Sequence, residues 1–264
     1  REVEEHHAKV LINAAGPWVA DIINTKLQLN SKDNIRLVRG SHIVVPKLYD
    51  HDKCYFFQGT DGRVIFSIPY EYDFTLIGTT DVDHDGIETK PVCSDSEKDY
   101  LINFASKYFA KGISPKDVVW SYSGIRPLYD DGTESAAAAT RDYVLKLEHN
   151  VGSAPLLNIF GGKITTYRKL AEAAIAEIAS FFPNLSAPWT AKSSLPGGNF
   201  PVEDVGKLIE KLRADFRFLT EIRAKRLIRA YGLNAWELLK GAVKLEDLGQ
   251  QFGDFLTKRE VDYL

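Results

Sequence analysis

The sequence predicts an α+β protein in which an antiparallel sheet, flanked by strand-turn-helix units, precedes a small all-helical C-terminal domain. Beyond residue 34, turn signals such as Asp61-Gly62 separate the β-rich runs RLVRGSHIVVP, KCYFFQG, RVIFSIPY and FTLIGTT. Apolar runs that lead through glycine into helical spacing lie on both sides of this region. From residue 202 the apolar spacing is helical.

The first of these units is a strand, a glycine turn and a helix. Val10 to Ala14 form an apolar run, Ala15-Gly16-Pro17 form a tight turn, and residues 18–29 show helical spacing. Such a corner is typical of sites where a dinucleotide meets a parallel sheet. The signal is weak by itself, because the pattern G-x-G-x-x-G is missing.

Further elements follow the β-rich region. Ser94 or Ser96 is predicted to cap a helix, with Glu97 in its first turn. VVWSYSGIRPLY predicts a strand that breaks at Pro127. DYVLKLE and PLLNIFGG predict a final strand pair, and a helix over residues 164–181 closes the unit.

A proline-rich connection precedes the C-terminal helices. Residues 183–201 are predicted to be a linker, because they contain Pro183, Pro188, Pro196-Gly197-Gly198 and Pro201. Residues 202–264 are predicted to form the helical domain, with helices at about 202–214, 220–231, 234–242 and from 252 onward.

Composition narrows the class of function. The chain has 264 residues, of which 44% are hydrophobic, and a formal charge of -3, which does not favour nucleic-acid binding. The two cysteines, Cys54 and Cys93, are too few for a disulfide framework and lack zinc-site spacing, so a reducing compartment is expected. No apolar run reaches the roughly 20 residues of a membrane span. We expect a soluble or membrane-surface protein with a small-molecule partner.

Gly161-Gly162-Lys163 stand directly before the expected helix. Glycines let the backbone approach a ligand, and the amides of a first helical turn attract anions or electron-rich ring atoms. A lysine here opposes the helix dipole, by about 0.3 to 1 kcal/mol when exposed, and a bound anion would compensate for it. The alternative is a simple turn with a solvated lysine.

Arg126 and His42 are the other candidate site residues. Arg126 follows an apolar β-run, where its guanidinium can bind a carboxylate or phosphate. The alternative is an ion pair with Asp130, Asp131 or Glu134. His42 begins a β-run, and a neutral imidazole can take a proton from a hydroxyl that loses hydride. The alternative is a structural histidine.

The other polar motifs are interpreted as surface features. IGTTDVDHDG carries Asp81, Asp83 and Asp85 but lacks the terminal glutamate of a calcium loop, so a solvated loop and no metal site are predicted. The histidines expected at the surface are His6, His7, His51 and His84.

Six segments occur in an informative order: LINAAGPWV, VRGSHIVVP, IGTTDVD, YSGIRPLYDD, TRDY and FGGKITTYRKLAE. Together they resemble the FAD-dependent glycerol-3-phosphate dehydrogenases of aerobic bacterial respiration, over essentially the whole chain. The resemblance implies a partial FAD-binding domain of the glutathione-reductase type in residues 1–34 and 151–182. It also implies an antiparallel substrate-binding sheet with a helix in residues 35–150, and a helical C-terminal domain.

The resemblance implies oxidation of sn-glycerol 3-phosphate to dihydroxyacetone phosphate, with hydride transfer from C2 to N5 of FAD. It assigns Arg126 and Lys163 catalytic and substrate-binding roles, holding the phosphate or the charge that develops at the C2 oxygen. His42 becomes the base or a substrate ligand, and Thr165 or Thr166 contacts substrate or flavin. We expect His42, Arg126 and Lys163 to share one concave site.

The resemblance also places two backbone segments against FAD. The residues are Ala14, Ala15 and Gly16 in the first segment, and Gly161, Gly162, Lys163, Ile164 and Thr165 in the second. The backbone amides of the second segment would reach the flavin pyrimidine edge, where reduced flavin accumulates negative charge.

The implied partners are quinone as electron acceptor, the inner face of the cytoplasmic membrane as a peripheral contact, and a second copy in a homodimer. One alternative is a glycerol-3-phosphate oxidase that uses oxygen. Another is a module whose basic helical tail, residues 207–229, docks on a partner or on anionic lipid. The interleaved acids Glu210, Asp215 and Glu221 favour an ordinary solvated face.

The family's glycine motif for FAD does not occur in this sequence, so we expect an incomplete polypeptide that binds FAD weakly or not at all and has no turnover alone. The flavin absorbance spectrum of the purified chain measures this. Flavin at normal stoichiometry would contradict the expectation.

Overall fold

The computed structural model describes residues 3–29, 31–133, 139–149 and 152–264. Its contacts divide the chain into two compact units, Arg1–Ser186 and Ala187–Leu264. Within the described residues, every helix is too short or too polar to cross a bilayer. The finer domain boundaries expected from the sequence stay predictions.

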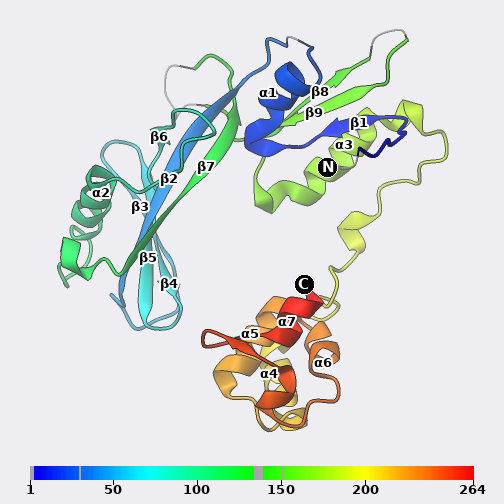
Figure 1. Ribbon diagram of the computed structural model, residues 1–264. Coiled ribbons are helices and arrows are strands. Elements are labelled where there is room, and N and C mark those ends of the chain that lie inside the picture. Colours follow the sequence, from blue (N-terminus) through cyan, green and yellow to red (C-terminus); the bar gives the residue numbers. More distant parts are fainter. Residues whose placement is uncertain (1–2, 30, 134–138, 150–151) are drawn as a thin grey trace. The chain divides into compact units, whose positions relative to one another are not determined.

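The first unit contains a six-stranded antiparallel sheet, as the β-rich runs predict (Figure 1). The strand order is β3-β4-β5-β2-β6, and β7 pairs with β2 in addition. The strands are β2 (Ile35–Pro46), β3 (Tyr55–Gln58), β4 (Val64–Tyr70), β5 (Phe74–Gly78), β6 (Val82–Asp83) and β7 (Trp120–Tyr129).

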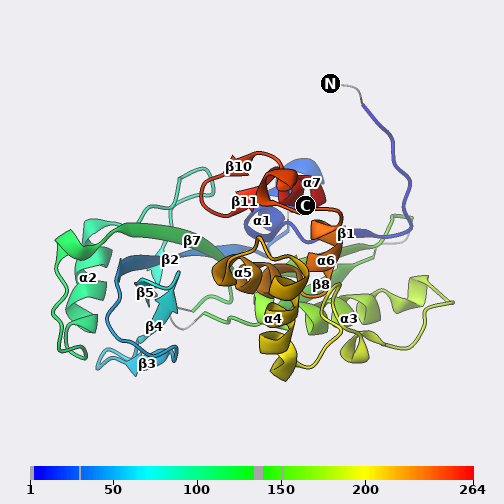
Figure 2. The ribbon, with the colours of Figure 1, turned by 90° about the horizontal axis from the view of Figure 1, so that it is seen from below.

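Strand β2 is bonded on both edges, to β5 and β6 on one side and to β7 on the other. Because side chains alternate along a strand, its odd-numbered and even-numbered residues face opposite sides of the sheet. Helix α2 (Asp95–Ala105) covers the odd side, where Ile43 and Ile77 form a core with Leu101 (Figures 1 and 2).

Ser94 rather than Ser96 caps α2. The Glu97 N–H donates to the Ser94 hydroxyl, and the Ser94 N–H donates to the Glu97 carboxylate, which is the capping box that the sequence indicates. A short 3-10 helix, η3 (Pro115–Asp117), then leads into β7.

The predicted break of β7 at Pro127 is wrong, because the strand continues to Tyr129. Pro127 lies opposite Leu37 of β2, which is the strand that β7 pairs with in the sheet. An edge strand tolerates a residue without an N–H, since one side of it needs no ladder hydrogen bond.

A second sheet has three strands in the order β1-β9-β8. β1 (Leu11–Asn13) runs parallel to β9 (Leu156–Phe160), and β8 (Val144–Glu148) runs antiparallel to β9. The predicted final strand pair is therefore confirmed. β8 lies in this smaller sheet, although the expected boundary at residue 150 grouped it with the larger one.

Glycine corners join β1 and β9 to the helices that follow them. The helix after β1 is shorter and less regular than predicted, whereas the helix after β9 is confirmed. The segments after β1 are η1 (Gly16–Trp18, 3-10), α1 (Val19–Asp21) and η2 (Ile22–Lys26, π); those after β9 are η4 (Ile164–Thr166, 3-10), α3 (Tyr167–Glu177) and η5 (Ala179–Phe181, 3-10).

The second unit packs its helices around one core, in which Leu212 and Leu239 are fully buried. A two-stranded ribbon, β10 (Gln251–Phe252) with β11 (Leu256–Thr257), is added to the predicted helices, so the last helix begins at Lys258. The α-helices are α4 (Val205–Asp215), α5 (Glu221–Tyr231), α6 (Asn234–Leu239) and α7 (Lys258–Tyr263); 3-10 turns are η6 (Thr190–Lys192), η7 (Val202–Asp204) and η8 (Leu245–Leu248).

Leu212→Ala should lower the free energy of unfolding of the second unit by about 2–5 kcal/mol, because it removes apolar contacts and leaves a cavity. Chemical denaturation followed by circular dichroism measures the change. Val243→Ala is the control, since Val243 is 81% exposed and its truncation should stay within about 0.5 kcal/mol. Equal effects of the two substitutions would contradict the packing described here.

Candidate active site

His42 and Arg126 lie on the same side of the large sheet, away from α2. In the β2–β7 ladder, His42 is opposite Tyr122 and Val38 is opposite Arg126, with Gly40 opposite Gly124 between these pairs. Directly opposite residues point to the same side, and positions two apart do so as well. The register therefore brings together two of the three catalytic residues expected from the sequence.

Glycine is required beneath both side chains. A Cβ atom at Gly78 would lie 2.1 Å from the His42 ring, and one at Gly40 would lie 2.2 Å from the Arg126 guanidinium. Side chains of any other residue would displace these groups. The imidazole and the guanidinium thus lie directly over the backbone of the neighbouring strands.

The His42 imidazole is held in a partly buried stack. Its ring is parallel to that of Tyr122, with centroids 4.9 Å apart and an interplanar angle of 6°. Its Nδ1 atom is buried and has no hydrogen-bond partner among the described residues. Burial, and secondarily the positive charge of Arg126, lower the pKa of His42 to about 4. His42 is therefore neutral at pH 7 and can accept a proton.

Arg126 donates its hydrogen bonds to one segment, residues 79–81. Its Nη1 lies 3.1 Å from Asp81 Oδ1 and 3.3 Å from the Thr80 carbonyl oxygen, and its Nη2 lies 2.9 Å from Thr79 Oγ1. The ion pair considered with Asp130 or Asp131 is replaced by the pair with Asp81, and Glu134 lies outside the described residues.

A second guanidinium shares the Asp81 carboxylate. Arg141 Nη2 lies 3.0 Å from Asp81 Oδ2, and the Asp81 side chain is 15% exposed. Burial lowers the pKa of Arg126, whereas the Asp81 charge raises it. The result is a pair of arginines that converge on one carboxylate, an arrangement that suits recognition of a further anion.

The loop that contains Asp81 is only partly solvated, so its interpretation as a surface feature is wrong in two places. Asp81 is enclosed by arginines, and His84 is 8% exposed with its Nε2 donating to the Thr89 carbonyl oxygen at 2.8 Å. Asp83 does face solvent, with its side chain 59% exposed against Arg36. In the part of the chain that the structure describes, no acidic, histidine or cysteine cluster could hold a metal.

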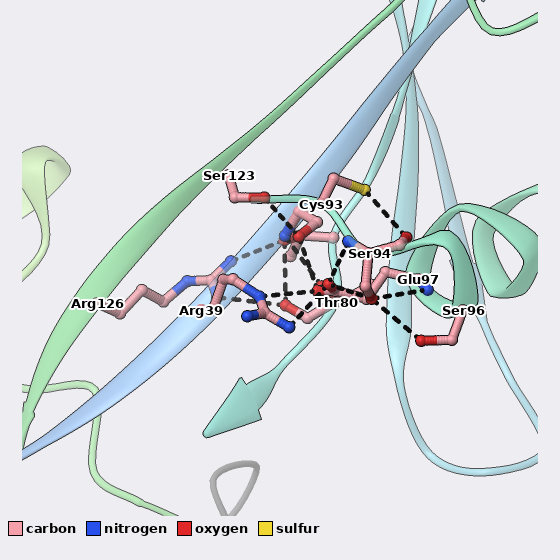
Figure 3. Close-up of polar contacts among 10 residues, drawn as sticks. Arg39, Thr80, Cys93, Ser94, Ser96, Glu97, Ser123 and Arg126 are labelled. Atoms are coloured by element: carbon pink, nitrogen blue, oxygen red, sulfur yellow. Dashed lines mark hydrogen bonds and ion pairs between the residues drawn. The ribbon is translucent and has the colours of Figure 1, made fainter. Parts of the chain in front are cut away.

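On the other side of the sheet, Glu97 is the centre of a buried polar cluster (Figure 3). Its Oε1 accepts hydrogen bonds from the hydroxyls of Ser41 and Thr80, each at 2.7 Å. Its Oε2 accepts from Ser94 and from Arg39 Nη2, the latter at 2.9 Å. Burial opposes the charged form, but the bonds from Ser94, Ser41 and Thr80 outweigh it and lower the pKa of Glu97 to about 2.

The corner after β9 presents backbone amides and one cation. Gly161 and Gly162 have φ values of 67° and 98°, which other residues rarely adopt. No side chain caps the following helix, and Ile164 is 89% exposed. Lys163 Nζ lies 3.4 Å from Asp142 Oδ1 and its side chain is 49% exposed, so in this structure its described partner is Asp142.

The corner after β1 is held by buried asparagines that sequence reasoning missed. Asn13 donates to the Val19 carbonyl oxygen and to Asn158 Oδ1, both at 3.0 Å. Asn158 in turn donates to Glu148 of β8. Gly16 has a φ of 56°, and open space lies where its Cβ would be. The turn can therefore accept a ligand close to its backbone.

The described cavities are lined by other residues than the three expected ones. One cavity, of about 340 Å³, lies beside Pro17, Trp18 and Ile125. Another, of about 480 Å³, lies between α2 and the start of β7. A concave site shared by His42, Arg126 and Lys163 stays a prediction.

Sequence reasoning also missed Asp81, Arg141 and Tyr122 as neighbours of the candidate residues, and it placed Glu97 only in the first turn of a helix that Ser94 or Ser96 caps. TRDY and IGTTDVD, which contain Arg141 and Asp81, were already signals within the resemblance. The pairing between them is long-range in sequence and becomes visible only in the folded sheet.

The low pKa of Glu97 makes stability depend on pH. The pKa of Glu97 in the folded protein, about 2, lies below its ordinary value of 4.5. The ionised carboxylate therefore contributes about 3 kcal/mol to the free energy of unfolding above pH 4.5, and this contribution is lost as pH falls through 2. Glu97→Gln should flatten the dependence of the unfolding free energy on pH between 4.5 and 2. Asp99→Asn, at an exposed position of the same helix, should keep the wild-type slope. An unchanged slope in Glu97→Gln would contradict the assignment.

Comparison with known proteins places this chain in a family. Residues 1–168 match the family described as FAD dependent oxidoreductase. The chain is 45% identical over 257 residues to the glycerol-3-phosphate dehydrogenase of Pseudomonas aeruginosa, covering 97% of this chain and 50% of that protein. It is 41% identical over 263 residues to the D-erythritol 1-phosphate dehydrogenase of Brucella abortus, covering 100% and 52%.

A solved structure is also similar, that of the glycerol-3-phosphate dehydrogenase from Bacillus halodurans complexed with FAD. The TM-score is 0.71 at 28% identity, covering 90% of this chain and 46% of that one. The chain spans about half the length of the curated relatives it matches. Because the family match extends over residues 1–168 of the 264, the chain belongs to the FAD-dependent oxidoreductases.

Proposed function

We propose that the full-length protein is an FAD-dependent glycerol-3-phosphate dehydrogenase that oxidises sn-glycerol 3-phosphate to dihydroxyacetone phosphate. One observation carries this proposal: a neutral, partly buried imidazole, His42, shares a sheet face with the guanidinium of Arg126. Oxidation of a phosphorylated alcohol needs a group that accepts the hydroxyl proton and a cation that binds the phosphate. The names of the relatives support the same substrate.

The two glycine corners suit FAD by the chemistry of their donors. The residues of the first turn after Gly161-Gly162 are exposed and no side chain caps their amides, which suits the acceptors of a flavin pyrimidine edge. Open space at Gly16 allows a dinucleotide to approach the backbone there. We assign cofactor contacts to Ala14, Ala15 and Gly16, and to Gly161, Gly162, Lys163, Ile164 and Thr165.

When bound, FAD supplies the acceptor for the hydride that leaves C2 of the substrate. Arg126, with Arg141 beside it, would hold the substrate phosphate, since planar guanidinium groups form paired hydrogen bonds to phosphate oxygens. Asp81 keeps both arginines oriented before the substrate arrives. Lys163, which has an exposed ammonium group, and Thr165 would complete the substrate contacts from the second corner.

His42 would accept the proton of the C2 hydroxyl. Its neutral form is available at pH 7, but a pKa of about 4 makes it a weak base. Part of that low pKa comes from the charge of Arg126. A phosphate dianion bound at Arg126 would offset this charge and raise the basicity of His42 once the substrate is present.

Delivery of electrons to quinone, peripheral contact with the inner face of the cytoplasmic membrane and formation of a homodimer are the finer parts of the proposal. They rest on the resemblance described above. The oxidase alternative is not favoured, because the relatives matched over this chain are named as dehydrogenases. The name of the Brucella relative makes D-erythritol 1-phosphate the competing substrate to test.

The docking-module alternative has less support. Several of its basic residues are paired within the second unit: Lys207 lies 2.7 Å from Asp204, Lys211 lies 2.5 Å from Asp215, and Arg226 Nη2 lies 2.6 Å from Glu260. Such pairing is typical of an ordinary solvated helix face.

Activity of the full-length protein with His42→Gln tests the proposed role. We expect kcat for sn-glycerol 3-phosphate to fall by about 10²–10⁴-fold with a smaller change in KM, because the proton acceptor is lost. His51→Gln, at an exposed position, is the control. Steady-state kinetics with an artificial electron acceptor measure both, and D-erythritol 1-phosphate is assayed in parallel. A wild-type kcat in His42→Gln would refute the role of His42. A higher kcat/KM for D-erythritol 1-phosphate than for sn-glycerol 3-phosphate would show that the proposed substrate is wrong.

The pH profile gives an independent test. Because His42 is neutral above about pH 4, its titration should appear in kcat/KM as an acid limb near that pH. A limb near about pH 6 from protonation of the substrate phosphate should persist in His42→Gln. An acid limb near 6.5 that disappears in His42→Gln would contradict the lowered pKa.

A further inference from the structure

The Glu97 carboxylate both caps α2 and bonds to strand β2 of the sheet. Oε2 accepts from the Ser94 N–H, which is the contact that caps α2. Oε1 instead reaches the sheet and accepts from Ser41 and Thr80. A helix cap alone would leave the second oxygen free to face water, yet the Glu97 side chain is 5% exposed. The buried charge therefore does more than begin a helix.

The contacts continue from Glu97 through Thr80 to Arg126. The Thr80 hydroxyl donates to Glu97 Oε1 at 2.7 Å and accepts from the Ser41 N–H at 2.9 Å. The Thr80 carbonyl oxygen accepts from Arg126 Nη1 on the other side of the sheet. The buried carboxylate is thus separated from the guanidinium by one residue, as Figure 3 shows.

The segment that holds Arg126 lies between strands. β5 ends at Gly78 and β6 begins at Val82, so residues 79–81 connect two short ladders. All three acceptors of Arg126 described above belong to this segment. Its backbone bond to β2, from the Thr80 N–H to the Ser41 carbonyl oxygen, is long at 3.4 Å. The hydrogen bond from the Thr80 hydroxyl to Glu97 is therefore important for holding residues 79–81 in place.

The same cluster also ties β7 to β2. The hydroxyls of Ser41 and Ser123 lie 2.8 Å apart, and Ser123 is three residues before Arg126 on its strand. Arg39 closes the cluster with its Nη2 2.9 Å from Glu97 Oε2 and balances the buried charge.

We propose that Glu97 is a positioning residue for Arg126: it holds Thr80, and through Thr80 it fixes the three acceptors that orient the guanidinium. The inference rests on the proposed function in one respect, namely that Arg126 binds the substrate phosphate. Glu97 itself lies on the covered side of the sheet and touches neither substrate nor cofactor.

Thr80→Val and Thr80→Ser in the full-length protein form a matched pair. Valine has the shape of threonine without the hydroxyl, whereas serine keeps it. We expect Thr80→Val to raise KM for sn-glycerol 3-phosphate, and the Kd of inorganic phosphate measured by calorimetry, by roughly tenfold, with a smaller change in kcat. Thr80→Ser should stay within about threefold of wild type. Glu97→Gln should resemble Thr80→Val, and Asp99→Asn should resemble wild type.

A double-mutant cycle separates positioning from a general loss of stability. In an Arg126→Lys background, Thr80→Val should add less than about twofold to KM and to the phosphate Kd, because the group that it positions is already gone. Lower thermal midpoints with unchanged KM and Kd, or full multiplication of the two effects, would overturn the proposal. If phosphate binding responds as expected but sn-glycerol 3-phosphate is not oxidised by wild type, the proposed function fails while the positioning role stands.

Discussion

The pairing of β2 on both of its edges is the constraint on which the candidate site depends. A slip of one residue would turn every side chain of β2 to the opposite face. Such a slip would move Ile43 out of the core under α2, so burial of apolar surface on one side specifies the register. The same register places His42, Gly40 and Arg126 on the other side. The position of the site is therefore a consequence of a core that the site does not touch.

A buried carboxylate on one face of the sheet and a half-buried one on the other then give the site its electrostatic character. Asp81 lies between Arg126 and Arg141. Glu97 lies on the opposite face of the sheet, where Arg39 is its counter-charge. Removing such charges from water is costly unless pairing and hydrogen bonds compensate. Here the same ion pairs and hydrogen bonds also orient the arginine N–H groups before any ligand binds. Such preorganised donors stabilise the charge of a transition state. Burial lowers the pKa of His42, whereas the low pKa of Glu97 comes from hydrogen bonds that outweigh its burial.

Much of the fold could be predicted because its signals are local. The alternating runs of the large sheet, the capping box at Ser94 and the helices of the second unit all depend on residues a few positions apart. Pro127 misled the prediction, because local sequence does not tell an edge strand from a central one. The partner of Arg126 was missed for a related reason. Asp130 and Asp131 are near in sequence, whereas Asp81 is near in the sheet.

The sequence by itself determined the order of the main strands and helices, the α+β class, the two glycine corners and the resemblance to flavin enzymes. These depend on side-chain periodicity, backbone freedom and motif order. The tertiary structure decided that His42 and Arg126 share a face, that Asp81 joins Arg126 to Arg141, and that Glu97 reaches Thr80 from behind the sheet. These contacts join segments tens of residues apart. Long-range strand pairing and packing against α2 bring such segments together, and no local pattern encodes which of them will meet.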